Sequence, residues 1–600
     1  MDMMKPIASA EKPAGKDWLY EVKYDGFRCI LHWELNESIH LTSKNNKDLT
    51  ANFPDIVAFC QEHVALVKPF LPLQLDGELV VLNNAFQADF ASIQKRGRLK
   101  NKASIQNAAK SRPASLLVFD ILQYKGSDCT RDSYQKRKSL LADFFTETDM
   151  KDRIGHIQAY DDVDKLGQII FDYKAEGMIA KRKDSVYQSG KDHHDWFKIK
   201  NWRTIHGFLT LYNPENDYFT VSIYDNDNAV EIGKCKHGLD AETFQTLQQI
   251  FTTKGDKSLE GHTLPPAICA SIHTLDLYKE ELREPEFDKL LPKMEAADCT
   301  VERLHLDMAM LPPTVNLTNI DKIFWSDKGL TKGDLLIYIR EIAPYMLPFL
   351  KERTLTVIRS PEGVDEEHFF QKNLPDYAPA FVESFEVDGE KRMICNSLDA
   401  LVWFANHGAV EYHIPFQTVQ HDEPSEIVFD LDPPGRDRFD LAIKAAGIIK
   451  PLLDDLDLIS FVKTSGNKGL QIHIPIRAGS MTYEETGVFT EAIARTIENA
   501  YPNLFTTERM KKNRNGRLYI DYLQHGKDKT LIAPYSPRKT DDATIAAPLF
   551  WEEVEDGLDP GQFTIENAIE RVKRLGCPFS SYFDVGREQQ LEKVLSLVRE

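Results

Sequence analysis

The chain contains 600 residues, and because single domains usually hold about 100–200 residues, we expect three or four domains. Apolar residues make up 42% of the chain and charged residues 28%, which is the profile of a soluble globular protein. No stretch reaches the roughly 18 consecutive apolar residues that a membrane span requires, and the first residues lack the apolar segment of a signal peptide. We therefore expect a cytoplasmic protein.

The net charge of −20 argues against nucleic-acid binding by the chain as a whole, but phosphate binding requires only local basic patches. One patch lies between Asp89 and Asp120, a stretch that contains no acidic residue, and a second lies at 509–517. The basic residues of the two patches are Lys95, Arg96, Arg98, Lys100, Lys102, Lys110 and Arg112, and Arg509, Lys511, Lys512, Arg514 and Arg517. For either patch, an ordinary solvated surface is an equally good interpretation.

The eight cysteines are scattered from Cys29 to Cys577, without a C-x-x-C pair or a Cys/His cluster at zinc spacing. This pattern predicts reduced, buried thiols and argues against a zinc module. His193 and His194 could form a metal pair, but adjacent side chains do not share a face of a helix or strand, so a metal site there is disfavoured.

The first third of the chain alternates short β-type runs with turns. In Trp18–Lys23 a period of two places Tyr20 and Val22 on one face of a strand and Glu21 and Lys23 on the other. The sequence therefore predicts a strand with one apolar face and one charged face.

The next segment combines strand-like and helix-like runs. Strands are predicted at His206–Tyr212, Tyr218–Tyr224 and Ala229–Lys234, and a helix at Ala241–Phe251. Several short strands with one helix fit a small Greek-key barrel such as an OB-fold.

After Val315 helices and strands alternate. Thr331 is placed to cap a helix that runs to about Lys351. Further helices are predicted at Phe439–Leu458 and Tyr483–Ala500, and strands at Glu426–Leu431, Ile472–Ile476 and Leu518–Leu523. This part is expected to be an α/β domain of its own.

Lys23, in the sequence Glu21-Val22-Lys23-Tyr24-Asp25-Gly26, is a candidate nucleophile. An amine attacks the α-phosphate of ATP only when it is deprotonated, and nearby cations and a bound metal would lower its pKa. Lys198 and Lys200 are the candidate cations, because they share one face of the strand-like run Trp196–Lys200. That run could equally be an ordinary amphipathic strand.

Carboxylates for the ribose and for Mg²⁺ are available in Asp76-Gly77-Glu78 and at Glu176, which precedes an apolar run. A single K-x-D-G motif is weak support, because short motifs often occur by chance. The order of the motifs is stronger support. It comprises Lys23-x-Asp25-Gly26, Ser43-Lys44-Asn45, Asp76-Gly77-Glu78, Phe119-Asp120, Glu176-Gly177 and Lys198-x-Lys200.

In this order the first 290 or so residues resemble the ATP-dependent DNA ligases of the covalent nucleotidyltransferase superfamily. The resemblance implies that Lys23 takes AMP as a phosphoramidate before AMP passes to DNA and the strand is sealed. It further implies that Glu21 reads the adenine, Arg28 contacts the nucleotide, Glu78 binds the ribose, Phe119 stacks on the base, Glu176 serves the metal, and Lys198 and Lys200 hold phosphates. Lys44 is a departure, since the family usually has Arg there, and lysine lacks the bidentate fork of arginine.

Asp430 and Asp432 stand two residues apart at the end of an apolar run, so a strand would point both carboxylates the same way, as two-metal phosphoryl transfer requires. Asp521, on another strand-like run, supplies a third acid. An isolated D-x-D is more often a solvated turn or helix cap. The loop Lys463–Gly469 favours a phosphate site, because its glycines allow backbone N–H groups to approach and Ser465 and Lys468 add donors.

These runs together resemble the archaeo-eukaryotic primase-like polymerase domain of bacterial DNA ligase D. The match extends from about Thr314 to Trp551. The motifs include Ile358-Arg359-Ser360-Pro361-Glu362-Gly363, Phe369-Phe370-Gln371-Lys372, Asp430-x-Asp432-Pro433-Pro434 and Ala533-Pro534-Tyr535-Ser536. The resemblance implies that Asp430, Asp432 and Asp521 bind two metals, that Ser465, Lys468 and Arg538 face the triphosphate, and that His413 lies near the acids. Gln471 is a departure, because the family's loop commonly ends Gly-Leu-His. His473 could partly substitute, or could be a core histidine.

The resemblances imply an α+β multidomain protein of the bacterial ligase D type, acting in non-homologous end joining of double-strand breaks. Its expected parts are a nucleotidyltransferase (adenylation) domain at 1–203, an OB-fold β-barrel domain at 204–292, a linker at 293–312 and a primase-like α/β polymerase domain at 313–600. No segment remains for the phosphoesterase domain of some relatives.

Expected substrates are ATP, ribo- or deoxyribonucleoside triphosphates with a family tendency toward ribonucleotides, and DNA ends and nicks. Mg²⁺ or Mn²⁺ is the expected metal, Ku the expected partner and the nucleoid the expected location. Two alternatives remain. An RNA capping enzyme or RNA ligase shares the lysine motif but would use GTP or need RNA ends. A DNA-end scaffold with inactive sites would fail to adenylylate itself.

Overall fold

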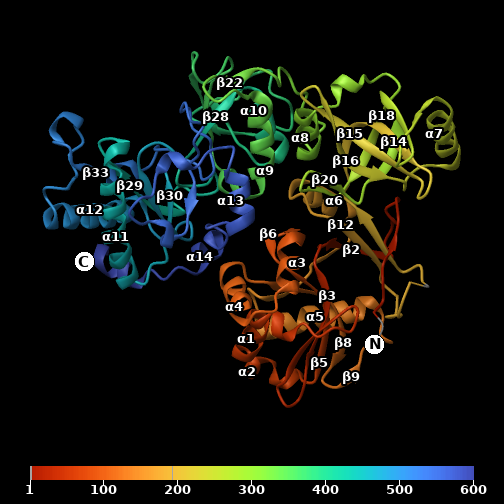
Figure 1. Ribbon diagram of the computed structural model, residues 1–600. Coiled ribbons are helices and arrows are strands. Elements are labelled where there is room, and N and C mark those ends of the chain that lie inside the picture. Colours follow the sequence, from red (N-terminus) through yellow and green to blue (C-terminus); the bar gives the residue numbers. More distant parts are fainter. Residues whose placement is uncertain (1–2, 192, 600) are drawn as a thin grey trace. The chain divides into compact units, whose positions relative to one another are not determined.

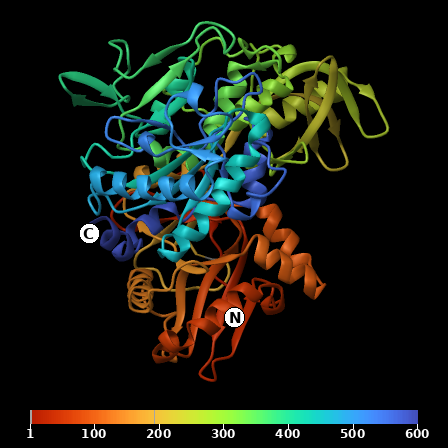
Figure 2. The ribbon, with the colours of Figure 1, turned by 90° about the vertical axis from the view of Figure 1, so that its left-hand side faces the viewer.

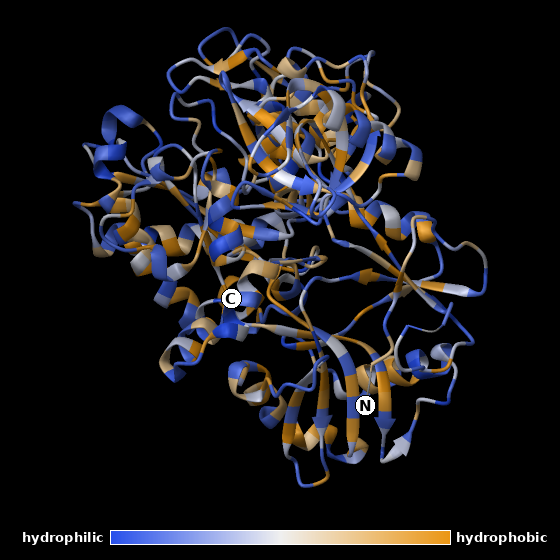
Figure 3. Cartoon of the chain, turned by 45° about the vertical axis from the view of Figure 1, so that its right-hand side comes forward, coloured by the Kyte–Doolittle hydropathy of each residue, from blue (hydrophilic) through white to orange (hydrophobic). Residues whose placement is uncertain are grey.

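The computed structural model describes residues 3–191 and 193–599, and the chain divides into two compact units, Met1–Met310 and Leu311–Glu600 (Figure 1). Each unit has its own sheets, and hydrophobic residues concentrate in the strands and helices while the loops are mostly hydrophilic (Figure 3). No helix in the described part of the chain has the length and apolar character of a membrane span. The expected α+β multidomain class is confirmed.

The first 200 residues form two sheets with helices packed against them. One sheet has the order β1 (Ile7–Ala8), β13 (Trp196–Lys200), β12 (Gly177–Arg182), β2 (Trp18–Lys23), β11 (Ala159–Tyr160). The other has the order β10 (Ile154–His156), β8 (Ser115–Tyr124), β5 (Leu73–Val80), β3 (Phe27–Trp33), β4 (Ile39–Ser43), and β9 (Ser127–Asp128) pairs with β8. The helices are α1 (Pro54–Glu62), α2 (Val64–Val67), α3 (Phe90–Arg98), α4 (Lys102–Ser111), α5 (Tyr134–Thr148) and α6 (Val163–Asp172), and β6 (Leu82–Asn84) pairs with β7 (Gln87–Ala88).

Strand β2 has the predicted division into two faces. Tyr20 and Val22 are buried in a core cluster with residues of α6 and β12, whereas Lys23 ends the strand on the opposite face. Lys23 pairs in register with Gly177 on β12. Gly177 has a φ of +154°, and a Cβ at this position would lie 2.1 Å from the Ile199 carbonyl oxygen, so only glycine fits beside the catalytic candidate.

The second part of this unit is a six-stranded antiparallel sheet with one long helix. Its order is β16 (Asn228–Cys235), β15 (Tyr218–Asp225), β14 (Arg203–Asn213), β18 (His262–Thr274), β17 (Asp256–Lys257), and β21 (Glu286–Leu290) pairs with β18. Helix α7 (Ala241–Lys254) contacts β14 and β18, and the hairpin β19 (Asp276–Tyr278)–β20 (Glu281–Arg283) follows β18. The predicted strands and helix of this segment are confirmed.

The segment 293–312 was expected to be a linker, and the structure corrects this expectation. It forms a 3₁₀ turn at Ala296–Asp298 and helix α8 (Val301–Ala309), whose Leu304 is buried in the core of the six-stranded sheet. Asp307 also binds the ring of His206 at 2.6 Å. The charged residues of this segment suggested a linker, but its apolar side chains, including Cys299 and Leu304, are spaced to pack against the sheet.

The second unit contains two main sheets, two hairpins and seven helices among its described residues. The sheets have the orders β32 (Phe505–Thr506), β33 (Leu518–Asp521), β29 (Glu426–Asp432), β31 (Leu470–Pro475), β30 (Phe461–Thr464), β35 (Pro548–Leu549), and β25 (Phe369–Gln371), β24 (Thr356–Arg359), β28 (Ala409–Ile414), β34 (Leu531–Ile532). The hairpins are β22 (Ile323–Trp325)–β23 (Leu330–Thr331) and β26 (Ser384–Val387)–β27 (Glu390–Met393). The helices are α9 (Lys332–Leu350), α10 (Leu398–Asn406), α11 (Asp440–Asp455), α12 (Tyr483–Ala500), α13 (Ala568–Leu575), α14 (Tyr582–Glu588) and α15 (Glu592–Arg599).

Helices α11 and α12 contact β29, the strand that carries two candidate catalytic acids (Figure 2). Thr331 caps α9 as predicted, and Asp334 completes a capping box with it. The helices therefore fix the sheet from which the acids project.

A buried ionic network ties the C-terminal segment to the start of β29. Glu426 accepts hydrogen bonds from Tyr582 at 2.6 Å and binds the His473 ring at 2.8 Å and Arg353 at 2.6 Å. Burial alone would raise the pKa of Glu426, but Arg353, together with His473 and Tyr582, holds it well below its ordinary value. His473 is therefore a core histidine and not a substitute in the phosphate loop.

We expect Glu426→Gln to destabilise the second unit. The variant leaves the buried Arg353 without its countercharge, which costs about 3–5 kcal/mol and lowers the melting transition by on the order of 10 °C. Because the folded-state pKa of Glu426 is depressed, its contribution is fully present above the ordinary value of 4.5 and is lost as the pH falls below it. Calorimetry at pH 7 and in acid measures the difference in melting temperature between wild type and Glu426→Gln, and this difference should be smaller in acid. Asp422→Asn, at a side chain that is 94% exposed, is the control; an equal effect from both variants would contradict the prediction.

Candidate active sites

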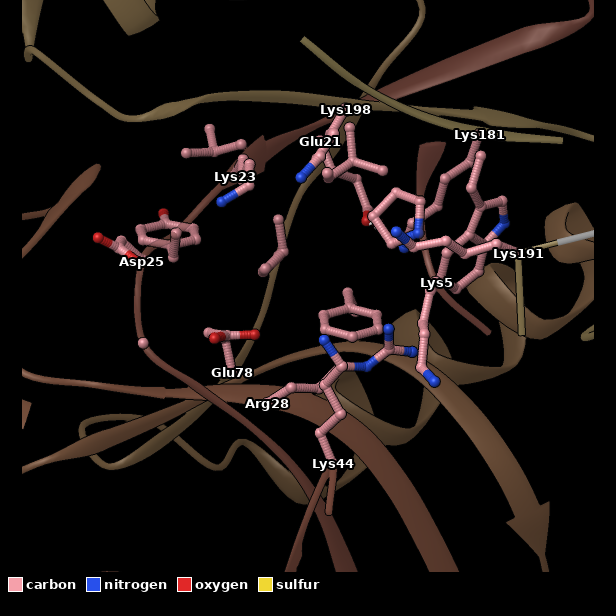
Figure 4. Close-up of a pocket in the computed structure, with 18 residues that line it drawn as sticks. Lys5, Glu21, Lys23, Asp25, Arg28, Lys44, Glu78, Lys181, Lys191 and Lys198 are labelled. Atoms are coloured by element: carbon pink, nitrogen blue, oxygen red, sulfur yellow. Dashed lines mark ion pairs between the residues drawn. The ribbon is translucent and has the colours of Figure 1, made fainter. Parts of the chain in front are cut away.

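The first candidate site is a cavity of about 310 Å³ between the two main sheets formed by the first 200 residues (Figure 4). Its charged lining comes from separate segments of the chain that the fold brings together. Among the lining residues are Lys5, Glu21, Lys23, Asp25, Arg28, Lys44, Glu78, Phe119, Lys181, Lys191 and Lys198. Seven of the residues expected from the sequence, from Glu21 to Lys198, therefore face one cavity.

Lys23 is held by Glu176, with 2.5 Å between Nζ and Oε2. Burial would lower the pKa of Lys23, but Glu176, with smaller effects from Asp25 and Glu78, outweighs burial and raises it. The expected lowering by Lys198 and Lys200 is therefore not the dominant effect in this geometry, because Lys23 forms an ion pair with Glu176. A cation that takes over Glu176 would release the amine for attack.

Glu176 suits a divalent cation. It offers hard oxygen donors beside Lys23, and burial, with a smaller effect from Asp25, raises its pKa although Lys23 and Arg283 oppose the rise. This observation supports the expected metal role of Glu176.

Glu21 lies at the inner end of the cavity in a buried cluster. Tyr134 donates to Glu21 at 2.6 Å, Lys181 lies 2.5 Å from it, and Lys138 also contacts it. Burial would raise the pKa of Glu21, but Lys138 and Lys181 lower it, so the carboxylate stays charged. Sequence reasoning gave no role to Lys138, which lies 117 residues further along the chain and has no local motif.

Arg28 and Phe119 form an adjoining wall. Asp76 holds the Arg28 guanidinium through two hydrogen bonds of 2.7 and 3.1 Å, and the guanidinium carbon lies 5.1 Å from the Phe119 ring centroid. The Lys181 ammonium lies 4.4 Å from the same centroid. Burial raises the pKa of Glu78 to about 8, so this carboxyl is mostly protonated at neutral pH and can both donate and accept a hydrogen bond.

The two lysines of the Lys198-x-Lys200 motif have different surroundings. Lys198 lines the cavity, whereas Lys200 binds Glu284 at 2.8 Å and Glu286 at 3.2 Å. The neighbouring Arg283 contacts Asp25 of the nucleophile motif. The hairpin region after β18 therefore supplies groups to the rim of the site that sequence reasoning did not assign.

The second candidate site lies on the central strands of the second unit. Asp430 and Asp432 project from β29, and Asp430 pairs in register with Asp521 on β33. Burial, with smaller effects from Asp521 and Asp432, raises the pKa of Asp430 to about 7. Burial also raises the pKa of Asp521. Three carboxylates thus lie on two adjacent strands, as predicted from separate motifs.

Cations and an amide already contact these acids. Lys468 lies 2.8 Å and Arg514 3.1 Å from Asp432, and Gln471 donates to Asp430 at 3.1 Å. Within residues 3–191 and 193–599, no three His, Cys, Asp or Glu side chains converge as a ready-made metal group. The hard oxygen donors and the raised pKa of Asp430 nevertheless suit divalent cations.

Among the other expected residues, Ser465 belongs to the Lys463–Gly469 loop and Arg538 packs against Gly466 of that loop. The Ser465 hydroxyl accepts from the Gly469 N–H at 3.0 Å and so closes the loop on itself. Arg538 lies 3.3 Å and His413 3.0 Å from Glu411, a residue that sequence reasoning missed. His413 therefore pairs with Glu411, and among the described residues no contact joins it to the three aspartates.

Gln471 also contacts Lys463, a fully buried lysine. Burial lowers the pKa of Lys463 to about 7. Gln471 therefore bridges two residues. Its amide oxygen accepts from the Lys463 ammonium, and its amide nitrogen donates to Asp430.

A basic cavity of about 150 Å³ lies elsewhere in the second unit. Lys322, Lys332 and Arg359 line it, and burial lowers the pKa of Lys332 to about 8. Arg359 lies over the ring of Phe369, 5.0 Å from its centroid, and the next residue, Phe370, is 70% exposed. The motifs that contain Arg359 and Phe369 were part of the polymerase resemblance, but no site was predicted from them.

The histidine pair and the cysteines behave as ordinary structural residues. His193 binds the Lys5 carbonyl at 3.1 Å and accepts from the Asp195 N–H at 3.2 Å. All eight cysteines are free thiols, and seven of them are buried, as predicted.

Comparisons with known proteins match both halves of the chain. Residues 2–200 match the family model of the ATP dependent DNA ligase domain, and residues 331–579 match that of the LigD primase-polymerase domain. The chain is 41% identical to the bifunctional non-homologous end joining protein LigD of Bacillus subtilis (strain 168), over 99% of this chain and 98% of that protein. It is 24% identical to the multifunctional non-homologous end joining protein LigD of Pseudomonas aeruginosa, over 98% of this chain and 72% of that protein. The solved polymerase domain of Mycobacterium tuberculosis ligase D in complex with DNA is 31% identical, over 46% of this chain and 99% of that chain, with a TM-score of 0.43.

Proposed function

This chain belongs to the bacterial LigD family of non-homologous end joining proteins, and on that premise we propose that its two sites fill and then seal DNA ends. It is a nucleotidyltransferase with an ATP-dependent DNA ligase domain and a primase-polymerase domain. The observation that carries the proposal is the presence of a half-buried lysine nucleophile in one unit and of three sheet carboxylates in the other.

In the ligase site, Lys23 Nζ attacks the α-phosphate of ATP, a P–N bond forms and pyrophosphate leaves. The placement of Glu21 with its two lysines supports recognition of the adenine edge, and Phe119 supports stacking on the base. Glu78, protonated near neutral pH, suits the ribose hydroxyls. Glu176 would hold the divalent cation, which would neutralise charge that develops on the phosphate.

The AMP then passes to the 5′-phosphate of a nicked strand, and the 3′-hydroxyl displaces it to seal the strand. Arg28, Lys44 and Lys198 face the cavity and would hold phosphate oxygens during these steps. Lys200 can do so only after it leaves Glu284 and Glu286.

In the polymerase site, Asp430, Asp432 and Asp521 would hold divalent cations, which would lower the pKa of the primer 3′-hydroxyl and neutralise charge on the leaving pyrophosphate. Ser465 and Lys468 belong to the glycine loop, and Arg538 packs against Gly466 of this loop. These three residues would bind the triphosphate once Lys468 leaves Asp432. The carboxylates suit Mg²⁺ and Mn²⁺ alike, and the family favours ribonucleotides.

DNA is the proposed macromolecular substrate of both sites. In the second unit, the basic cavity at Lys322, Lys332 and Arg359 supports a contact to DNA phosphate, and the exposed ring of Phe370 supports stacking on a base. Family membership supports Ku as the partner that brings DNA ends, and the nucleoid as the place of action.

The test supplies the wild-type protein with α-labelled ATP or GTP and follows the label by denaturing electrophoresis. We expect an adduct from ATP alone, which nicked duplex DNA converts into AMP–DNA and then into sealed strand. The same preparation should extend a primer opposite a template gap when a divalent metal is added. A protein without any adduct would refute the ligase assignment and favour a scaffold, and an adduct from GTP would favour RNA chemistry.

A further inference from the structure

The acid-free segment of the first unit folds into two consecutive helices, α3 and α4, joined by residues 99–101 (Figure 2). Five of its basic side chains are exposed: Lys95, Arg98, Lys100, Lys102 and Lys110. None of the five forms an ion pair with any residue that the structure describes. A protein with a net charge of −20 thus concentrates five uncompensated positive charges on one short segment.

Arg96 shows that the fold does not need these five charges. It is buried, binds Asp55 through hydrogen bonds of 2.7 and 2.8 Å, and anchors α3 to the start of α1. Ile93 and Ile105 are the buried apolar contacts of α3 and α4. Removing the exposed cations therefore removes charge without removing the contacts that hold the helices.

The exposed part of these helices has the chemistry of a phosphate-binding surface. Besides the five cations it presents the hydrogen-bonding side chains of Ser104, Gln106 and Asn107, and no large apolar side chain of 90–112 is exposed. A surface of cations and polar groups without an apolar centre suits a nucleic-acid backbone better than the core of a protein interface.

Helix α3 also begins at the rim of the nucleotide cavity. The Arg283 guanidinium lies 4.4 Å from the ring centroid of Phe90, the first residue of α3, and Arg283 also contacts Asp25. At the other end of α3, Gly97 packs directly on the ring of Phe27, which adjoins the cavity residue Arg28. Helix α3 therefore lies beside the nucleotide cavity.

We propose that α3 and α4 bind the sugar-phosphate backbone of the duplex that flanks the nick, a role that rests on the proposed ligase function. Helices of nine and ten residues are about 13 and 15 Å long, and B-DNA carries one charge per about 1.7 Å of axis, so several phosphates lie within reach. Binding releases the counterions of those phosphates, and this release gives the ligase unit affinity for DNA that does not depend on base-specific contacts.

The test compares a triple variant, Lys95→Ala, Lys100→Ala and Lys110→Ala, with wild type in the full chain. The matched control replaces Lys68, Lys136 and Lys151 by alanine, three lysines of the same unit that are 66–68% exposed and bound to carboxylates. Three measurements are made on each protein: the enzyme–AMP yield, the Kd for nicked duplex over a salt series, and the sealing rate.

We expect the triple variant to form enzyme–AMP like wild type, because that step involves no DNA. Its Kd for nicked duplex should rise at least about tenfold, and the slope of log K against log salt should fall by up to about 2.7, which is 0.9 for each lost phosphate contact. Sealing at low DNA concentration should slow in parallel and recover at high DNA concentration, while the control keeps the wild-type values.

Equal DNA affinity and salt slope for the triple variant and wild type would overturn the proposal, and would also be the outcome if the surface served an acidic protein instead. Equal losses in the triple variant and the control would overturn it too, because net charge alone would then explain the effect. A wild-type protein that forms no adduct would instead refute the proposed function itself, so the two failures are distinguishable.

Discussion

Lys23→Ala is expected to abolish enzyme–AMP formation, with a loss of at least about a thousandfold in the rate of adduct formation. The reason is direct: the amine that accepts AMP is gone, and the remaining cavity lysines, such as Lys198, do not occupy the place beside Glu176. Labelling with α-labelled ATP and denaturing electrophoresis measure the result.

The same variant should still seal a nick that already carries AMP on its 5′-phosphate, since the last step needs no nucleophile from the enzyme. Lys68→Ala, which removes an exposed lysine paired with Glu37, should label like wild type. An adduct of normal yield in Lys23→Ala would move the nucleophile to another lysine.

Asp430→Asn is expected to reduce primer extension by at least about a thousandfold while leaving enzyme–AMP formation unchanged. The amide keeps the size of the carboxyl and can still accept from Gln471, so the sheet should be preserved. It removes one of three negative charges that would hold the divalent cations. Gap filling with labelled nucleotides measures the first activity, and ATP labelling the second.

Asp422→Asn, at an exposed position in the same unit, is the control and should extend primers normally. Normal extension by Asp430→Asn would exclude the β29 carboxylates from the chemistry. A loss of both activities would point to misfolding, which calorimetry detects separately.

The spacing of apolar residues along the sequence predicted the strands and helices that carry the sites. Trp18–Lys23 and Tyr483–Ala500 were predicted with the bounds that the structure has, because an apolar period of two or of 3.6 runs through their full length. Thr331 was recognised as a cap because its hydroxyl precedes a long apolar run. Helices α3 and α4 were not predicted, because their basic sequence has few apolar positions from which to read a period.

Within the sites, residues that belong to a sequence motif could be predicted. The residues that contact them from distant parts of the chain could not. Glu21 and Lys23 lie in one hexapeptide, but Tyr134 and Lys138 reach Glu21 from more than 110 residues away. The pKa of Lys23 was expected to fall beside Lys198, Lys200 and a bound metal, whereas in the fold the ion pair with Glu176 raises it. Pairings of this kind depend on sheet register and helix packing, which no local pattern encodes.

The division of the chain into two compact units has a consequence for why the activities are joined. Among the described residues, those that line the lysine cavity lie in Met1–Met310, and the three aspartates lie in Leu311–Glu600. Joining the two domains in one chain is expected to raise the effective concentration of each enzyme at the product of the other. Two variants that each lack one activity, Lys23→Ala and Asp430→Asn, should together repair a gapped duplex, but their repair rate should fall more steeply on dilution than that of wild type.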